Sequence, residues 1–180
     1  TERFFHDDPN FFFIDFHGQK AVEQPGVKIE KQLQNIDVAM PKGIGGGDYA
    51  TIVKEVLDFA INRRKFTPDI IINYAGFDSH VDDGFNRGQI KVDYHTFAEL
   101  TNVYLRLSEH LCEGRLLCIS GGGYAAKKQE VAPICAYNTI MILAKKWDNV
   151  LKKDDPLEES DSIAKIKTNS ILKDIMRFSI

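Results

Sequence analysis

The sequence has no apolar run as long as a membrane-spanning helix. It also has no excess of positive charge. The chain has 23 Lys and Arg and 26 Asp and Glu. Its net charge of −3 gives no support for a general nucleic-acid or anionic-membrane surface. Internal repeats and low-complexity tracts are absent, and the amino end is neither a signal nor a transit peptide. We therefore expect neither direct nucleic-acid binding nor membrane binding.

Cysteine is scarce. Cys112, Cys118 and Cys135 are odd in number and have no C-x-x-C spacing of the kind that binds metals. Cys118 lies in a strand pattern and the other two lie in helix patterns. This distribution predicts buried thiols in a reducing compartment, so we expect an intracellular protein, cytoplasmic or nuclear.

The length and composition suit one hydrophobic core. A chain of 180 residues with 43% hydrophobic content can bury one core and is too short for two typical domains. The composition shifts at Lys152, where a charged, proline-interrupted connector begins. We therefore predict one domain over residues 1–150, and a connector with a tail helix, Ile163 to Met176, over residues 151–180.

Strand patterns alternate with helix patterns along the chain. The expected strands are Phe11–Phe16, which we predict to be fully buried, Asn35–Met40, Ile70–Ile72 and Arg115–Ser120. Three helices are expected before the tail helix: one that begins after an Asp48 N-cap, one from about Asp93 to Cys112, and one from about Glu130 to Trp147. The segment Gly18–Lys31 is expected to be a loop. This order predicts an α/β fold with a parallel sheet between layers of helices.

The stretch from Pro68 to Asp83 is the most informative in the chain. The β-branched run at Ile70–Ile72 predicts a buried strand, which breaks at Gly76 into a loop rich in acids and containing His80. In open α/β sheets, ligands bind just past the carboxyl ends of the strands, and carboxylates there suit a divalent metal. Asp and Gly are also ordinary loop residues, so the pattern alone leaves both interpretations open.

A second strand ends in a similar way. The Arg115–Ser120 run is followed by three glycines, Gly121 to Gly123, and then by Tyr124. Consecutive glycines let the backbone turn sharply and approach a ligand closely. A phosphate cradle is the alternative, but neither a Walker lysine pattern nor a G-x-G-x-x-G fingerprint follows, which makes a nucleotide site the weaker option.

Both junctions resemble the histone deacetylase family of zinc amidohydrolases. Residues 75–83, A-G-F-D-S-H-V-D-D, are close to the family's A-G-F-D-A-H-x-x-D loop, and Gly122-Gly123-Tyr124 matches its G-G-Y turn. Three further segments resemble family motifs in the right order: Asp7 to His17, Ile36 to Pro41, and Gly43 to Tyr49. The resemblance covers about residues 1–143 and implies an arginase/deacetylase-like sheet.

The resemblance also indicates what is missing. In the family, a D-x-H-H-G-N-G segment with two of the three zinc ligands immediately precedes the position of Thr1, and a His-His pair lies further upstream. No stretch of this chain replaces either one. We therefore expect the carboxyl-terminal half of a deacetylase domain, truncated on its amino-terminal side, with a zinc site that is incomplete.

The resemblance assigns catalytic roles to a few residues. Asp83 falls at the third zinc ligand, and Tyr124 at the tyrosine whose phenol stabilises the oxyanion formed from the scissile amide. Gly122 and Gly123 would leave room for the stem of an acyl-lysine. Asp78, His80 and His17 are expected to hold the metal-binding residues in position without binding the metal themselves.

The resemblance further implies structural potassium or sodium ions. Asp15 and Phe16 match positions beside one such cation near the zinc. Phe5, Asp8 and Phe11 match positions whose backbone oxygens hold a second.

Two functions remain open. The leading hypothesis is a fragment of a zinc-dependent amidohydrolase that deacetylates acetyl-lysine, an acetylpolyamine or a related small amide. We expect it to be inactive alone and to need the missing amino-terminal half as its partner. For the fragment by itself, a bound potassium or sodium ion and the lack of any cofactor are the alternatives. The alternative is a non-catalytic α/β module that binds a partner, or forms a homo-oligomer, through an exposed sheet edge.

Overall fold

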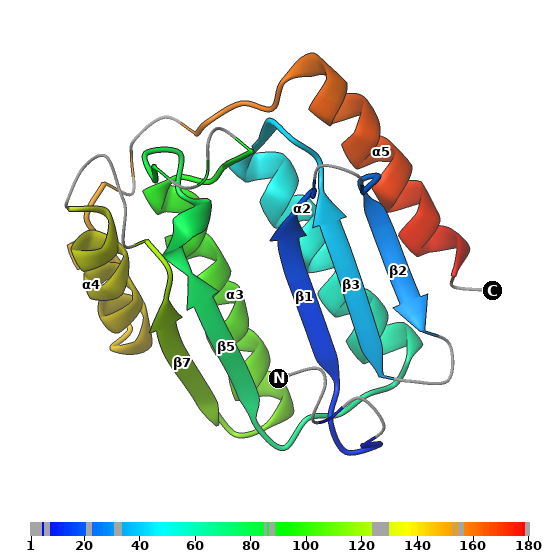
Figure 1. Cartoon of the computed structure of the whole chain (residues 1–180). Helices are drawn as coiled ribbons and strands as arrows, with labels where there is room; N and C mark the ends of the chain where they lie inside the picture. Colours follow the sequence, from blue (N-terminus) through cyan, green and yellow to red (C-terminus); the bar gives the residue numbers. More distant parts are fainter. Residues whose placement is uncertain are drawn as a thin grey trace.

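The computed structural model describes residues 5, 8–20, 23–30, 34–84, 86, 89–123, 130–152, 154 and 157–178. Two groups of long strands lie side by side, with helices α2 and α3 behind them (Figure 1). Helix α5 lies beside the first group of strands and α4 beside the second. The predicted α/β class, with parallel strand pairs and helices packed against them, is confirmed.

The first group contains β1 (Phe13–Gly18), β3 (Asn35–Met40) and β2 (Gly26–Glu30). Strand β1 runs parallel to β3, and β2 runs antiparallel to it. The prediction that Gly18–Lys31 is entirely loop was wrong, because Val27 and Ile29 alternate with exposed Lys28 and pack against the core. The predicted full burial of β1 was also wrong, since Asp15 is exposed.

The second group contains β5 (Ile71–Gly76) and β7 (Leu116–Gly121), which pair in parallel. The prediction of a buried strand at Ile70–Ile72 was wrong, because Ile72 is 50% exposed and Tyr74, further along β5, is 69% exposed. Only one face of this pair is covered by a described helix, so alternate side chains reach solvent.

Four long helices accompany the strands: α2 (Gly46–Asp58), α3 (Tyr94–Leu111), α4 (Val131–Leu143) and α5 (Ser162–Arg177). The shorter elements are β4 (Ile44–Gly45), β6 (Ile90–Lys91), η1 (Phe59–Arg63), η2 (Phe77–Ser79) and η3 (Trp147–Asn149). In the part of the chain that the structure describes, no helix has the length and apolarity needed to cross a membrane.

The amino ends of α2 and α3 are built differently. Asp93 caps α3 as its side chain accepts a hydrogen bond from the Thr96 N–H at 2.8 Å, which confirms the predicted start of that helix. The prediction of an Asp48 N-cap was wrong: α2 begins at Gly46, and Gly45 is its cap. The Asp48 carboxylate instead lies in the first turn, where a negative charge favours the helix dipole.

The segment 157–161 supplies the partners that the start of α2 needs. The Gly45 N–H donates to Ser160 Oγ at 2.7 Å, and the Gly46 N–H donates to the Glu158 carbonyl at 3.1 Å. The Glu158 N–H in turn donates to the second oxygen of Asp93 at 2.9 Å. The connector predicted over residues 151–180 is thus hydrogen-bonded to the starts of both central helices, and α5 follows it onto the core.

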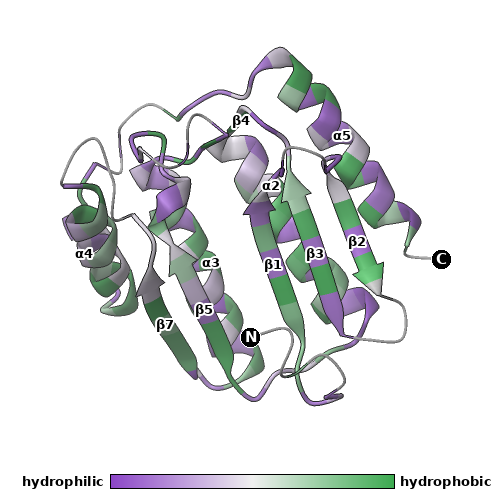
Figure 2. Cartoon of the chain, viewed as in Figure 1, coloured by the Kyte–Doolittle hydropathy of each residue, from purple (hydrophilic) through white to green (hydrophobic). Residues whose placement is uncertain are grey.

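The core lies between the helices and one face of the strands. Its largest cluster joins side chains of β3, α2 and α5, among them Val38, Ile52 and Ile171. The opposite face of the strands has no described helix over it. Strands β5 and β7 are rich in apolar residues (Figure 2), and Ile72, Leu117 and Ile119 on them are exposed.

Candidate functional site

The carboxyl ends of β5 and β7 meet at one edge of the sheet. Their pairing places Gly76 opposite Gly121, so the two loops that follow start next to each other. Gly122 has φ +74°, and a Cβ on it would lie 2.4 Å from Asp78 Oδ1. The structure therefore brings Asp78 and Gly122 together, at a distance that only glycine permits.

Gly123 continues the same close approach. Its φ is +79°, and a Cβ there would lie 3.0 Å from the Phe77 Cβ. Tyr124, which the resemblance assigns to catalysis, lies outside the described residues. The placement of its phenol relative to Asp83 stays a prediction.

The loop after β5 is packed into the interior. Asp83 is 2% exposed, and its N–H donates to the His80 carbonyl at 2.9 Å. His80 is also buried, and its Nδ1 accepts the Asp82 N–H at 3.1 Å. The His80 ring packs against Tyr94, with ring centroids 4.3 Å apart. His80 thus anchors the loop that carries Asp83 onto the start of α3, which suits a supporting role.

Asn86 fixes the far end of this loop, and the sequence reasoning missed it. Its Nδ2 donates to the His80 carbonyl at 3.0 Å, and its Oδ1 accepts the Ile90 N–H at 2.8 Å. Asn86 is buried, so these contacts are shielded from water. A polar residue inside a glycine-flanked turn was the available signal, but its partners are set by the fold.

Tyr49 is a partly buried tyrosine in α2. Burial raises the pKa of the Tyr49 phenol far above its usual range, and so does nearby Tyr104. The negative charges of Asp15, on β1, and Asp78, after β5, raise this pKa further. The phenol therefore remains a hydrogen-bond donor at neutral pH.

His17 lies on the open face of β1. Its Nε2 lies 2.9 Å from Asp37 Oδ1 on β3, and its Nδ1 lies 3.1 Å from the Gly18 carbonyl. The sequence reasoning did not single out Asp37. Its importance follows from the β1–β3 register, which places it directly opposite Asp15.

The expected monovalent-cation residues are close to one another in the chain and in space. The Asp8 N–H donates to the Phe5 carbonyl, and the Phe11 N–H donates to the Asp8 carbonyl, both at 3.1 Å. The Phe5 and Phe11 rings stack with centroids 4.4 Å apart. Phe16 lies on β1 with its ring 6.4 Å from that of Tyr49. These contacts give consecutive turns before β1, and the two cations stay predictions.

The residues near Asp83 do not complete a zinc site. Zinc bound for catalysis takes three protein ligands and leaves one position open. Among the described residues, the one group of at least three His, Cys, Asp or Glu side chains placed to share a metal is Asp15, His17 and Asp37, which excludes Asp83. No described residue joins Asp83 in such a group, and its assignment as a zinc ligand stays a prediction.

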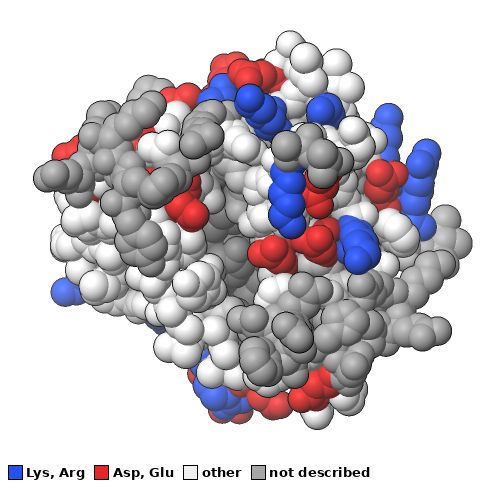
Figure 3. Space-filling model, in the orientation of Figure 1, with Lys and Arg blue, Asp and Glu red and all other residues white. Residues whose placement is uncertain are grey.

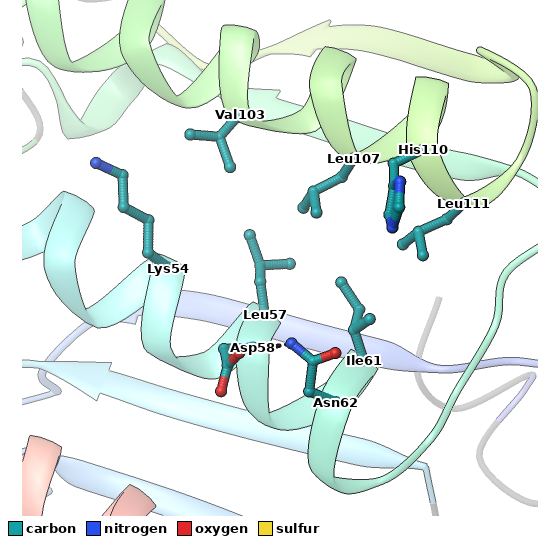
Figure 4. A pocket seen from close by; sticks show the side chains of 9 residues that line it. All are labelled: Lys54, Leu57, Asp58, Ile61, Asn62, Val103, Leu107, His110 and Leu111. Atoms are coloured by element: carbon teal, nitrogen blue, oxygen red, sulfur yellow. Dashed lines mark hydrogen bonds between the residues drawn. The ribbon is translucent and has the colours of Figure 1, made fainter.

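A hollow lies elsewhere on the molecule. It has a volume of about 270 Å³ and lies between α2 and α3, where Leu57, Val103 and Leu107 line it (Figure 4). Asp58 and Asn62 hydrogen-bond to each other at its rim. These residues lie toward the carboxyl ends of the two helices, whereas the strand-end loops lie near the start of α3. The hollow is therefore not part of the candidate site.

Comparison with known proteins identifies the family. The model of the histone deacetylase domain matches residues 1–134. A probable deacetylase of Archaeoglobus fulgidus is 24% identical over 132 residues, which cover 71% of this chain and 36% of that protein. The chloroplastic histone deacetylase 14 of Arabidopsis thaliana is 25% identical over 178 residues, 93% of this chain and 41% of that protein. The chloroplastic histone deacetylase 10 of Oryza sativa subsp. japonica is 31% identical over 126 residues, 67% of this chain and 27% of that protein.

Solved structures show the same fold. The HDA15 HD domain superposes with a TM-score of 0.67 at 19% identity and covers 98% of this chain, which spans 48% of that chain. The histone deacetylase Clr3 gives a TM-score of 0.61 at 19% identity, with 99% of this chain and 29% of that chain covered. The chain thus spans less than half the length of each of these relatives. Together, the family match and the shared fold show that it belongs to the histone deacetylase family.

Proposed function

We propose that this chain forms one part of a zinc-dependent deacetylase that hydrolyses an acetyl amide on lysine, a polyamine or a related small molecule. The observation that carries the proposal is the contact between Asp78 and Gly122. It unites the two family motifs at one edge of the sheet, where α/β enzymes bind their substrates. Family membership supports a deacetylase-type hydrolase, and the substrate and the metal are part of the proposal.

Each part of the chain has a role in this proposal. Asp83 would hold the zinc as one of its ligands, and the bound metal would polarise the acetyl carbonyl and activate a water. Tyr124 would donate a hydrogen bond to the oxygen that becomes negatively charged. Gly122 and Gly123 would let the substrate stem pass close to the backbone. Buried His80 and Asn86 would hold the Asp83 loop in place.

We propose further that the chain is inactive by itself. Asp83 is one ligand, and the described residues around it do not provide the others. The relatives are more than twice as long as the matched part, so the remaining ligands and the proton-accepting histidines would come from another portion of the domain.

The open face of β5 and β7 supports this division. Ile72 and Tyr74 on β5, and Leu117 and Ile119 on β7, are large apolar side chains exposed on that face. A soluble domain rarely leaves such a strip uncovered, because burying apolar area is favourable by about 25 cal/mol per Å². We propose that the complementary part of the deacetylase domain packs there.

The test measures deacetylation of an acetyl-lysine peptide and of acetylputrescine, with zinc binding followed by calorimetry. The untagged chain is compared with the same chain joined to the polypeptide encoded directly upstream in its reading frame. We expect activity only in the joined protein, and its loss in the Asp83→Asn and Tyr124→Phe variants. Turnover by the chain alone would refute the proposed incompleteness, and an inactive, zinc-free joined protein would refute the enzyme.

A second candidate function has an observation in its favour. The same apolar strip could pair two copies of the chain, which would make it a non-catalytic module that self-associates through β5 and β7. Sedimentation of the chain over a range of concentrations separates the two, since a stable dimer that persists in the joined protein would favour the module.

A further inference from the structure

We propose that Asp15, His17 and Asp37 bind a divalent transition-metal ion on the open face of β1 and β3. The ligand atoms of these three side chains all lie within 4.8 Å of one another. Metal–ligand bonds of about 2.0–2.2 Å place two ligands at most about 4.4 Å apart, so a small rotation of the exposed Asp15 side chain closes the site. The proposal does not depend on the deacetylase activity.

Strand geometry builds the ligand set. Asp15 and His17 are two residues apart on β1, so their side chains project from the same face. The parallel register places Asp37 of β3 directly opposite Asp15. The alternate residues of both strands, such as Phe16 and Val38, pack on the helix side. The three ligands are therefore attached to two hydrogen-bonded strands with a packed core behind them.

The surroundings of the imidazole are rich in oxygen atoms. His17 Nε2 lies 2.9 Å from an Asp37 oxygen, and its Nδ1 lies 3.1 Å from the Gly18 carbonyl and 3.8 Å from a Glu23 oxygen. A carboxylate oxygen beside a ring nitrogen can take an N–H from that nitrogen, or it can share a metal ion with it.

A metal ion on Nε2 fits this arrangement of oxygen atoms. It would bridge His17 Nε2 and the Asp37 carboxylate, while Nδ1–H donates to the Gly18 carbonyl. Metal-binding histidines usually donate their second N–H to a carbonyl or carboxylate in this way, which fixes the tautomer and the ring orientation. The Gly18 carbonyl already occupies that position.

The donor types select the class of metal. One imidazole nitrogen and two carboxylates suit Zn²⁺, Co²⁺ or Ni²⁺, whereas Mg²⁺, Ca²⁺ and monovalent ions prefer oxygen alone. The site also differs from the one predicted at Asp83, which follows β5. Figure 3 shows charged residues gathered over the side of the open face where β1, β3 and β2 lie. Among them, exposed Lys28 faces Asp37 across the β2–β3 pair and would limit the affinity.

The test uses the untagged full chain after treatment with a chelator. Calorimetry with Zn²⁺ and Co²⁺ is expected to give one saturable site. His17→Gln and Asp37→Asn should each weaken it at least tenfold. His110→Gln, which alters a histidine away from the site, should leave the affinity unchanged. Circular dichroism checks that each variant is folded.

A second readout covers variants that fail to fold. Nitrogen-15 NMR of the wild-type histidine rings should show paramagnetic broadening by Co²⁺ at His17 before any other histidine. No saturable binding to the wild-type chain would overturn the proposal. So would binding that survives in His17→Gln but is lost in Asp83→Asn, or broadening that begins at another histidine.

Discussion

The open face of the molecule has two unlike halves. Over β1, β3 and β2 it carries Asp15, His17, Asp37 and Lys28, whereas over β5 and β7 it carries isoleucine, leucine and tyrosine side chains. Figure 3 shows this difference as a charged region beside an uncharged one. The helix side of β1 and β3 is apolar, whereas that of β5 also carries Asn73. The two halves therefore differ most clearly on the open face.

The comparison shows what each half requires. Charged side chains are stable in water, so the polar half needs no cover and can hold an ion. Exposed apolar side chains lose the favourable free energy of burial, of about 1.5–3 kcal/mol for each large residue, until something covers them. We therefore propose the apolar half as a surface for protein contact and the polar half as a surface for ligands.

The largest expected effect comes from comparing the two faces directly. Ile36→Ala removes a fully buried side chain of β3 and should lower the free energy of unfolding by about 2–5 kcal/mol. Ile72→Ala, on the open face of β5, should lower it by about 1 kcal/mol or less. Urea denaturation followed by circular dichroism measures both. Equal losses would mean that Ile72 is buried in solution, and the comparison would fail.

The second prediction concerns the strand ends. Gly122→Ala places a Cβ against Asp78 and requires an alanine at positive φ, so it should cost about 1–3 kcal/mol of stability. Gly47→Ala is the matched control, because a Cβ there meets no atom within 4 Å and lies in the first turn of α2. That variant should be neutral or stabilised by up to about 1 kcal/mol. A neutral Gly122→Ala would argue against the close approach of the two loops.

The third prediction concerns two tyrosines, Tyr49 and Tyr104. Tyr49 packs against Phe16 of β1. Burial raises the pKa of Tyr104, and Cys118 on β7 raises it to a smaller extent. The pKa of each phenol is raised far above 10 in the folded protein. The unfolded chain releases these protons near pH 10, so the stabilisation is complete below that pH and is lost as the pH rises above it.

This loss amounts to about 1.4 kcal/mol per tyrosine for each pH unit above 10. Urea denaturation between pH 9 and pH 11 measures it. Tyr49→Phe and Tyr104→Phe should each flatten the decline, while the control Tyr137→Phe, on the exposed surface of α4, should not. An unchanged slope in both buried variants would show that these phenols are accessible to water.

The smallest effect on stability is expected from Ile72→Ser combined with Leu117→Ser. Both side chains are about half exposed, so the free energy of unfolding should change by about 1 kcal/mol or less. Self-association should nevertheless decrease, because the apolar half loses its main contacts. Analytical ultracentrifugation checks this, with Lys28→Ser on the polar half as the control. If Lys28→Ser weakens self-association as much as the double variant does, the apolar half would not be the contact surface.

Much of the fold follows from local pattern. The apolar stripe from Phe97 to Leu111 and the capping Asp93 predict α3 correctly. The β-branched run at Ile70–Ile72 predicts β5 but not its exposure, since a continuous apolar run carries no information about which layers are present. Strand β2 was missed because two apolar residues separated by one lysine are too few to establish a period.

The site was predictable only where a motif lies within one stretch of chain. The loops at Asp78 and Gly122 were found in this way, and their contact follows from the pairing of β5 with β7. Asp37 and Asn86 were missed because their partners are set by strand register and loop closure. The Asp48 cap was wrong because Ser160, 115 residues from Gly45 in the chain, supplies the hydrogen bond instead.

That bond from Ser160 has a consequence for the order in which the fold can form. Ser160 is synthesised 115 residues after Gly45, yet the first turn of α2 takes hydrogen-bond partners from Glu158 and Ser160. The start of α2 therefore cannot be completed by local contacts during synthesis. It is finished only when the later segment has been made and has docked against it.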